Sequence, residues 1–485
     1  MNGPVGFEPL AAVLPDFDAE AGQPLALVIV PSMSFDQQLL RNVLGIQYYE
    51  ERQLALLLQL RDPQMHLVYC SSTHISDEIV DYYLDLIPAV PASNSRRRLT
   101  MVACDDTEPV PLTQKLLDRP DLLRRIESAV AGIPHRGVVA MNTTALEGEL
   151  AQRLDMPLLG NPPAVDHLGS KSGSRECFRA AGVPMPAGFE RLHSQSDVIS
   201  ALADLKALKP DLQAAVVKLE EGFSGEGNAV YRYEYGSDAA QIAEALPGAL
   251  KCQAPAETYQ SFMGRFDVMG GIVEEFLPGV HASPSGQGYI GADGAVLPLS
   301  THDQVLGGRD GQVFEGSTFP AEQHYRMEVQ DATLRVGEVL RGGGALGRYA
   351  VDFVEADDGL FAIEINLRQG GTTHPMLTMT VVTEGAYDPG NGTFLSAQGA
   401  QKCYYATDNL QDDRFRGMHI SEVITAAVEG GLTYDPVREH GCVFHMLGAL
   451  REYGKLGVTC VADTREQAAD YYRAVTDMMW SLRSD

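Results

Sequence analysis

Lysine is scarce in this sequence: only eight of its 485 residues are lysine, whereas 65 are aspartate or glutamate. The formal net charge is −28 at pH 7. A field of that sign repels phosphate backbones and anionic lipid headgroups, so it argues against a nucleic-acid binder or a protein of anionic membrane surfaces. Small molecules and cationic peptides remain as partners. Because lysine is rare, each lysine inside a motif is informative.

Paired cysteines and long apolar runs are also missing. The seven cysteines stand singly, without a CxxC pair, and predict neither a disulfide framework nor a metal site. No run approaches the ~18 apolar residues of a membrane span, and the first residues lack the basic and apolar regions of a signal peptide. We therefore expect a cytoplasmic protein with no membrane partner, and the sequence leaves its oligomeric state open.

The N-terminal third lacks a GxGxxG motif after its first predicted strand, which argues against a Rossmann dinucleotide site. Short apolar runs typical of buried strands alternate here with helical patterns. Strands are predicted at 25–32, 65–72, 99–106, 136–142 and 156–161, and helices at 50–60, 74–88, 112–132 with a break at Pro120, and 145–155. This alternation predicts a mostly parallel α/β domain that ends near residue 160.

A pair of acidic strands is predicted in the stretch GRYAVDFVEADDGLFAIEINLRQGGTTHP, residues 347–375. Asp352 falls near the end of one strand, and Glu364 and Asn366 lie two residues apart on the next, facing the same side. A turn through 356–359 brings Asp352 alongside them. Oxygen donors that converge in this way are what Mg2+ takes up, usually with phosphate oxygens. A solvated acidic surface is the alternative, which the intervening apolar residues disfavour.

Lysine and glycine form a second candidate site upstream. Lys171 begins a predicted helix that stops at Gly182, and Lys218 lies on a strand directly before a glycine-rich turn at 222–227. Glycines let backbone N–H groups approach an anion closely. The turn is not a P-loop, because GxxxxGK[ST] is absent and a strand follows it. An inert hairpin is the alternative, and the adjacent lysine favours an anion site.

Two further segments have the composition of binding segments. In residues 269–291, predicted as strand, turn and strand, backbone groups beside the apolar Phe276 and Leu277 suit an adenine ring. Residues 300–322 are polar and glycine-rich and predict a long loop that either binds a ligand or is solvated. A linker is predicted at 384–392, helices at 420–429 and 464–482, and strands at 442–450 and 456–462.

The order of these parts resembles the ATP-grasp superfamily, in which two α+β lobes clasp ATP. Between residues 171 and 368 the chain has the two lysines, the glycine turn, the EEFL sequence, Asp352 and the pattern Glu364-x-Asn366-x-Arg368. The resemblance implies ATP and Mg2+ as cofactors, with two metal ions expected.

The resemblance also implies a role for each residue. The implied cofactor-binding residues are Lys171 and Lys218 at the α- and β-phosphates, Gly222, Ser224, Gly225 and Gly227 in the loop over the phosphates, and Glu274, Glu275, Phe276 and Leu277 in the adenine-binding hinge. His281 stands where many relatives have an acidic residue for the ribose hydroxyls. The implied metal ligands are Asp352, Glu364 and Asn366.

A narrower resemblance, to the pheganomycin-type peptide ligases, covers nearly the whole chain. It rests on the sequences ASPSGQ (282–287), STHDQVLGG (300–308), FPA (319–321), EINLRQGGTTHP (364–375) and MLGALREYGKLGV (446–458). It implies an α/β and α+β multidomain protein. The implied domains are a pre-ATP-grasp parallel α/β domain at 1–160, a two-lobed ATP-grasp core at 161–385 and a small α+β C-terminal accessory domain at 386–485.

The implied reaction is the ATP-dependent joining of an amino-acid carboxylate, activated as an acyl phosphate, to the amine of a peptide. The partners are then a small-molecule carboxylate and a peptide or amine substrate. Two alternatives stay open: a ligase that joins another small carboxylate to ammonia or a small amine, and a non-catalytic ATP-binding regulator.

Within that reaction, we expect Arg368 and the backbone N–H groups near Gly370 and Gly371 to hold the acyl phosphate and the tetrahedral oxyanion. Arg368 also belongs to the expected substrate contacts. The others are His302, Gln304 and His374, and either histidine could assist deprotonation of the amine.

Overall fold

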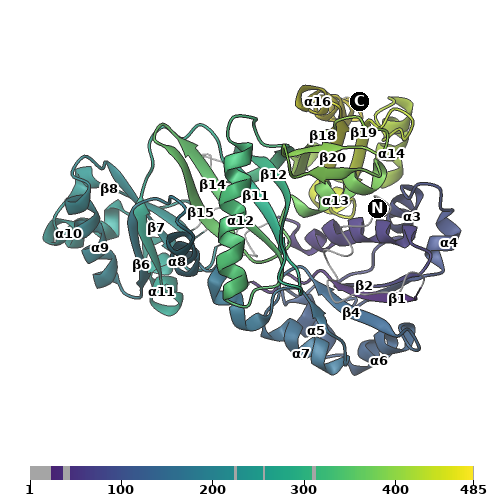
Figure 1. The fold of residues 1–485 in the computed structure, drawn as a ribbon, viewed down its shortest axis with the longest axis horizontal. Coiled ribbons are helices and arrows are strands. Elements are labelled where there is room, and N and C mark those ends of the chain that lie inside the picture. Colours follow the sequence, from purple (N-terminus) through teal and green to yellow (C-terminus); the bar gives the residue numbers. More distant parts are fainter. Residues whose placement is uncertain (1–22, 36–43, 223–226, 255–256, 308–312, 484–485) are drawn as a thin grey trace.

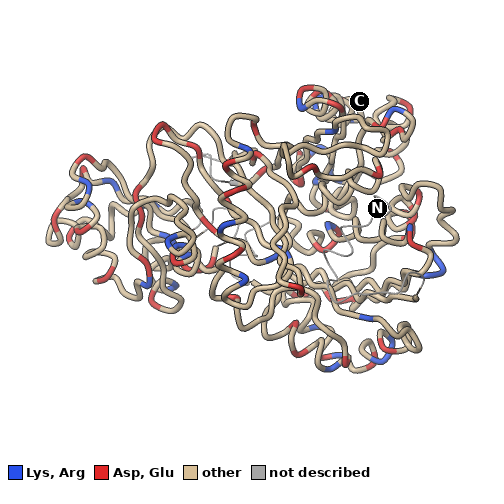
Figure 2. Tube along the Cα trace, viewed as in Figure 1, with Lys and Arg blue, Asp and Glu red and all other residues tan. Residues whose placement is uncertain are grey.

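The computed structural model describes residues 23–35, 44–222, 227–254, 257–307 and 313–483, and three large β-sheets organise this part of the chain (Figure 1). The fold combines a parallel α/β layer with antiparallel sheets and a C-terminal α+β part, as the sequence predicts. Aspartate and glutamate are spread over all of these parts (Figure 2). In the described ranges, no helix is both long and apolar enough to cross a membrane.

The first sheet is parallel and has the order β3-β2-β1-β4-β5. Its strands are β1 (Leu25–Val30), β2 (Met65–Ser71), β3 (Leu99–Ala103), β4 (His135–Ala140) and β5 (Leu158–Leu159). The accompanying helices are the 3-10 helix η1 (Ile46–Arg61), α3 (Asp77–Asp85), α4 (Ala92–Arg96), α5 (Leu112–Leu117), α6 (Pro120–Ala129) and α7 (Ala145–Arg153). The predicted strands and the predicted break at Pro120 are confirmed: buried strands read as continuous apolar runs, and proline is best tolerated in the first turn of a helix, where Pro120 begins α6.

The second sheet is antiparallel and has the order β6-β10-β7-β8-β9. Its strands are β6 (Gly188–Leu192), β7 (Ala214–Leu219), β8 (Asn228–Arg232), β9 (Lys251–Cys252) and β10 (Gly271–Glu275). Its helices are α9 (Gln195–Leu208), α10 (Ala239–Ala249) and α11 (Tyr259–Met269), which share an apolar core with it. The two strands predicted on either side of the glycine turn are β7 and β8, and residues 223–226 of that turn lie outside the described residues.

The third sheet has eight strands in the order β15-β14-β11-β12-β13-β18-β20-β19. They are β11 (Pro284–Ile290), β12 (Val296–Gly307), β13 (Val313–Phe319), β14 (Gly347–Ala356), β15 (Gly359–Asn366), β18 (Cys403–Gln411), β19 (Gly441–His445) and β20 (Lys455–Ala462). The helices around it include α8 (Lys171–Ala181), α12 (Arg326–Gly342), α13 (Thr373–Val382), α14 (Ile420–Glu429), α15 (Ala449–Tyr453) and α16 (Arg465–Ser481). The sheet takes strands from both sides of residue 385, where the sequence predicts a domain boundary.

Two predictions about connecting segments are wrong. The sequence predicts a loop at 300–322, whereas residues 300–307 complete β12 and residues 313–319 form β13, paired antiparallel with it. The predicted linker at 384–392 contains β16 (Ala386–Asp388), which pairs with β17 (Thr393–Leu395). In both places, pairing with a neighbouring strand satisfies the backbone hydrogen bonds, so polar composition misleads.

One apolar core joins the N-terminal and C-terminal parts of the chain. Leu57 and Tyr83 belong to the same buried cluster as Phe444, Leu456 and Met479. Figure 1 shows the corresponding purple and yellow-green segments side by side. This core fixes η1 against the C-terminal strands, and through η1 it fixes one wall of the site described below.

Leu456→Ala should lower the free energy of unfolding by about 2–5 kcal/mol, because Leu456 is fully buried and the truncation leaves a cavity in this shared core. Leu208→Ala is the matched control: Leu208 is 64% exposed, and its truncation should change stability by less than about 0.5 kcal/mol. Urea denaturation of the two variants measures both values. If both variants lost the same free energy of unfolding, packing in the shared core would not explain the effect of Leu456→Ala.

Candidate functional site

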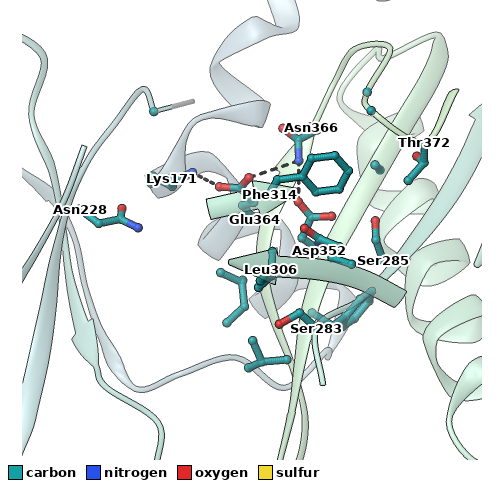
Figure 3. A pocket seen from close by; sticks show the side chains of 18 of the residues that line it. Lys171, Asn228, Ser283, Ser285, Leu306, Phe314, Asp352, Glu364, Asn366 and Thr372 are labelled. Atoms are coloured by element: carbon teal, nitrogen blue, oxygen red, sulfur yellow. Dashed lines mark hydrogen bonds and ion pairs between the residues drawn. The ribbon is translucent and has the colours of Figure 1, made fainter. Parts of the chain in front are cut away.

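The β14–β15 hairpin aligns three side chains that carry oxygen donors. Its register pairs Asp352 with Glu364, and Asn366 follows two residues later. The Asn366 amide Nδ2 donates to Asp352 Oδ2 at 3.0 Å and to Glu364 Oε1 at 3.3 Å (Figure 3). Burial raises the pKa of the Asp352 carboxyl. The convergence predicted from the sequence is therefore present, with two carboxylates and an amide within hydrogen-bonding distance.

Lys171 brings a positive charge to this trio from the first residue of α8. Ser170 caps the helix by accepting a hydrogen bond from the Gly173 N–H, and Gly182 ends it in a left-handed conformation, as predicted. The Lys171 ammonium forms an ion pair with Glu364. Burial and the nearby positive charges of Lys218 and Arg368 lower the pKa of Lys171 to about 7. An anion beside these cations would therefore be strongly stabilised.

Lys218 points into the same region from β7, in the second sheet. Its ammonium lies 2.5 Å from Glu274 Oε1, and Arg175 Nη1 lies 3.1 Å from the other oxygen of Glu274. Glu274 is only 2% exposed, so one buried carboxylate sits between two cations. Arg175 also contacts Glu190 Oε2 at 3.2 Å, so Lys218 is the ammonium that this side of the site brings to the cavity wall.

A cavity of about 400 Å3 connects these groups, and its walls come from all three sheets and the segments that follow their strands. That volume is within the range of small-molecule sites. Of the residues predicted from the sequence, it is lined by Lys171, Lys218, Gly222, Glu274, Glu275, Phe276, Leu277, Gln304, Asp352, Glu364, Asn366, Arg368, Gly370 and Gly371.

The predicted hinge forms the apolar end of the cavity. Phe276 and Leu277 line it beside Val216 and Pro186. The Phe276 N–H donates to the Ala214 carbonyl at 3.1 Å, so in this structure it makes a hydrogen bond within the protein and does not point a free donor into the cavity. Phe276 and Leu277 give an apolar surface beside the backbone that follows β10, and such a surface suits a flat heteroaromatic ring.

The segment from Arg368 to Thr372 forms another wall. Gln369 anchors it to the end of β4: its backbone N–H donates to the Met141 carbonyl at 2.9 Å, and its side chain donates to the Ala140 carbonyl at 3.2 Å. The Arg368 guanidinium carbon lies 4.9 Å from the centre of the Phe35 ring. Burial lowers the pKa of Arg368, and the carboxylates of Asp352 and Asp166 oppose that shift.

The glycine-rich turn is only partly described. Gly222 lines the cavity, and Gly227 has a φ of +91°, which favours glycine, while its carbonyl accepts from the Leu219 N–H at 2.9 Å. Ser224 and Gly225 lie outside the described residues. Their predicted phosphate contacts stay predictions.

The three predicted histidines do not join this cavity in the described structure. His281 is on the surface, with Nε2 2.7 Å from Asp357 Oδ1. His302 is fully buried, with its ring nitrogens on Ser300 Oγ at 2.7 Å and Tyr404 Oη at 2.9 Å, and burial lowers its pKa to about 3. His302 is therefore held by the core, because strand pairing turns its side chain away from the substrate space.

His374 lies close by, on α13, and lines a separate cavity of about 20 Å3 together with Gln369 and Gly370. Its Nε2 is 3.0 Å from Asp408 Oδ1, and it is 5% exposed. A space of that size matches a single water molecule, so no substrate group reaches His374 there.

Several cavity residues were not predicted from the sequence. They include Tyr49 and Arg52 on η1, Met141 after β4, Phe314 on β13 and Asn409 on β18. The only signal for Arg52 is its place among residues 50–60, a helical pattern whose leucines predict burial. The others come from segments distant from the motif and carry no local signal.

Among the described residues, no group of three or more His, Cys, Asp or Glu side chains is arranged to hold a metal ion. The third side chain of the trio on β14 and β15, Asn366, has an amide oxygen besides the Nδ2 that donates to Asp352 and Glu364. An all-oxygen set of two carboxylates and an amide is hard-donor chemistry, which fits Mg2+ better than a soft transition metal.

Two family models match parts of the chain. One, described as IQCH-like, ATP-grasp, matches residues 162–235, and the other, described as PGM1 C-terminal domain, matches residues 422–475. Over 465 residues the chain is 32% identical to the L-propargylglycine–L-glutamate ligase of Streptantibioticus cattleyicolor, and the match covers 93% of each protein. It is 23% identical to IQ motif-containing protein H of Danio rerio, over 91% of this chain and 47% of that protein.

Solved structures share the fold at low identity. The biotin carboxylase domain of 2-oxoglutarate carboxylase from Hydrogenobacter thermophilus, in complex with MgADP, ADP and bicarbonate, matches with a TM-score of 0.55 at 12% identity, over 93% of this chain and 89% of that one. The N5-carboxyaminoimidazole ribonucleotide synthetase from Thermus thermophilus matches with a TM-score of 0.51 at 16% identity, over 95% of this chain and 99% of that one. At such identities the likeness concerns the fold alone.

Proposed function

The chain belongs to the ATP-grasp carboxylate–amine ligases of the pheganomycin type, and from this membership we propose that it joins an amino-acid carboxylate to the amine of a second amino acid or a short peptide. The observation that carries the proposal is the meeting of Lys171, Lys218, Arg368 and the Asp352–Glu364–Asn366 trio in one cavity. These groups suit the transfer of a phosphoryl group between anions, which needs charge neutralisation and alignment rather than a protein nucleophile.

ATP occupies the cavity with its adenine against Phe276 and Leu277 and its phosphates between Lys171 and Lys218. Asp352, Glu364 and Asn366 would hold Mg2+, and two ions are proposed. The donor set fits, because two carboxylates and an amide, all with oxygen donors, lie within hydrogen-bonding distance on one hairpin. When bound, Mg2+ supplies neutralisation of the phosphate charge.

The donor carboxylate attacks the γ-phosphorus of ATP, the bond from that phosphorus to the bridging oxygen breaks, and ADP leaves. The product is an acyl phosphate. The acceptor amine then attacks the acyl carbon, the carbon–oxygen bond to phosphate breaks, and phosphate and a proton are released. Arg368 and the backbone N–H groups at Gly370 and Gly371 stabilise the negative charge that develops in both steps.

The relative from Streptantibioticus cattleyicolor acts, by its name, on L-propargylglycine and L-glutamate. We infer that the substrates of this chain are small amino acids of similar kind.

ADP release should depend on Mg2+, on a carboxylate donor and on an amine acceptor together, and mass spectrometry should detect a condensed product. The assay uses purified protein, ATP, Mg2+ and pairwise mixtures of L-glutamate, L-propargylglycine and the proteinogenic amino acids. Ammonia and small amines are tested in parallel, which separates a ligase of amino acids from a ligase of simpler amines. ATP binding without any donor-dependent turnover would instead indicate a regulatory protein.

A further inference from the structure

Arg52 brings a buried guanidinium to the wall of the cavity next to Gly370. It lies on η1, in the N-terminal part of the chain, and is 8% exposed. It lines the main cavity together with Arg368, Gly370 and Gly371. It also shares the small cavity of about 20 Å3 with Gln369 and Gly370, so η1 and the segment after β15 face each other directly.

The guanidinium is only partly satisfied by the protein. Its Nη2 lies 2.6 Å from Asp408 Oδ2, and its Cζ lies 3.9 Å from the centre of the Tyr49 ring. Its Nε has no hydrogen-bond partner among the described residues. Leaving a buried donor unpaired is costly, and the planar fork of arginine suits a carboxylate. These features indicate that Arg52 has capacity for an anionic ligand group.

The charge around Arg52 also favours an anion. The Lys455 ammonium lies 4.8 Å from the centre of the same Tyr49 ring and donates to the Tyr49 hydroxyl at 2.9 Å. Asp408 is the carboxylate paired with Arg52, and burial raises the pKa of the neighbouring Glu51 to about 8, so that group is mostly uncharged at neutral pH. Lys455 is thus a cation near Arg52 in addition to the Arg52–Asp408 ion pair.

We propose that Arg52 binds the α-carboxylate of the amine-donating substrate and that this substrate is a single amino acid. The inference rests on the proposed ligation. In any such ligation the amine donor keeps its own α-carboxylate, because only the other substrate is activated. Arg52 selects for that carboxylate and thereby determines acceptor specificity.

Spacing supports a single residue. The α-amine and α-carboxylate share one Cα, with bonds of about 1.46 and 1.52 Å, so they lie roughly 2.5 Å apart. Each additional residue moves the free carboxylate about 3.5 Å farther along the chain. Arg52 borders Gly370, the place proposed for the acyl phosphate, and this proximity fits an acceptor whose amine and carboxylate are adjacent.

The test compares each amine donor as the free acid and as its α-carboxamide, using L-glutamate and L-propargylglycine as probes. In the unaltered protein, KM for the free acid should be about 10- to 100-fold lower than KM for the carboxamide. Arg52→Gln should raise KM for the free acid by about the same factor and leave that for the carboxamide within about threefold, which abolishes the preference. Arg52→Lys should give an intermediate loss.

Asp408→Asn is the matched control, because it removes the ion pair but keeps the guanidinium, and it should retain the preference. Equal use of acid and carboxamide by the unaltered protein would overturn the proposal. If Arg52→Gln raised KM equally for the free acid and the carboxamide, Arg52 would have only a structural role. If the preference for a free α-carboxylate concerned the substrate that is activated and not the amine donor, Arg52 would bind the other substrate, and the proposal would be wrong. Efficient use of long peptides with a KM insensitive to Arg52→Gln would also overturn it.

Calorimetric binding of the same probes in the presence of ADP and Mg2+ separates the two proposals, since it needs no turnover. Binding of the free acids that weakens about 10-fold or more in Arg52→Gln, without any ligated product, would refute the ligation but retain the carboxylate site. Product formation with the same binding and KM in Arg52→Gln as in the unaltered protein would retain the ligation but refute the carboxylate site.

Discussion

Glu364→Gln should lower the rate of donor-dependent ADP release by at least about 100-fold in a protein that remains folded. The substitution preserves shape but removes the charge that faces Asn366 and Lys171 and that we propose for Mg2+ coordination. A metal ion supplies several kcal/mol of charge stabilisation in a transition state, and each 1.4 kcal/mol lost is about tenfold in rate. Steady-state kinetics across a range of Mg2+ concentrations measures the effect, and excess Mg2+ should recover part of it.

Glu355→Gln is the matched control. Glu355 lies on the same hairpin and accepts a hydrogen bond from His324 Nε2 at 2.8 Å, but it does not line the cavity. The same chemical change there should leave the rate within about twofold, as is usual for surface substitutions. Normal turnover in a folded Glu364→Gln protein would exclude the metal assignment and leave the hairpin as a structural acidic pair.

Arg368→Gln should reduce kcat by about 100- to 1,000-fold, the usual cost of losing one donor that stabilises developing negative charge. Arg368 is a cation in the wall shared with Gly370 and Gly371, and burial makes its charge effective there. Trapping with hydroxylamine distinguishes the two steps: acyl phosphate formed by the variant should fall in parallel with kcat.

Arg335→Gln on the surface of α12 removes the same charge far from the cavity lining and should leave kcat unchanged, because Arg335 pairs only with Asp331 and nearby carbonyls in the described structure. If Arg368→Gln raised KM for the carboxylate donor but left kcat intact, Arg368 would bind the ground state and not the reacting charge.

The acidic trio of the site was predictable because its three residues lie close together in the sequence. Asp352, Glu364 and Asn366 belong to one hairpin, so strand alternation and a turn suffice to bring them together. Lys218 and the glycine turn are also close in sequence, so their proximity was predictable in the same way. The histidines show the limit of such reasoning: His302 lies in a strand whose partners, β11 and β13, bury it against Tyr404. Composition alone predicts a loop there, either ligand-binding or solvated.

By itself the sequence determined the parallel N-terminal sheet, the hairpin with its oxygen donors, the helix that starts at Lys171 and the family of the chain. These features depend on periodicity, caps and short motifs, which act over a few residues. Only the tertiary structure decided that η1 packs against the C-terminal strands and turns Arg52 toward Gly370. That contact joins residues more than three hundred positions apart through one apolar core, and no local pattern encodes which distant surfaces will bury each other.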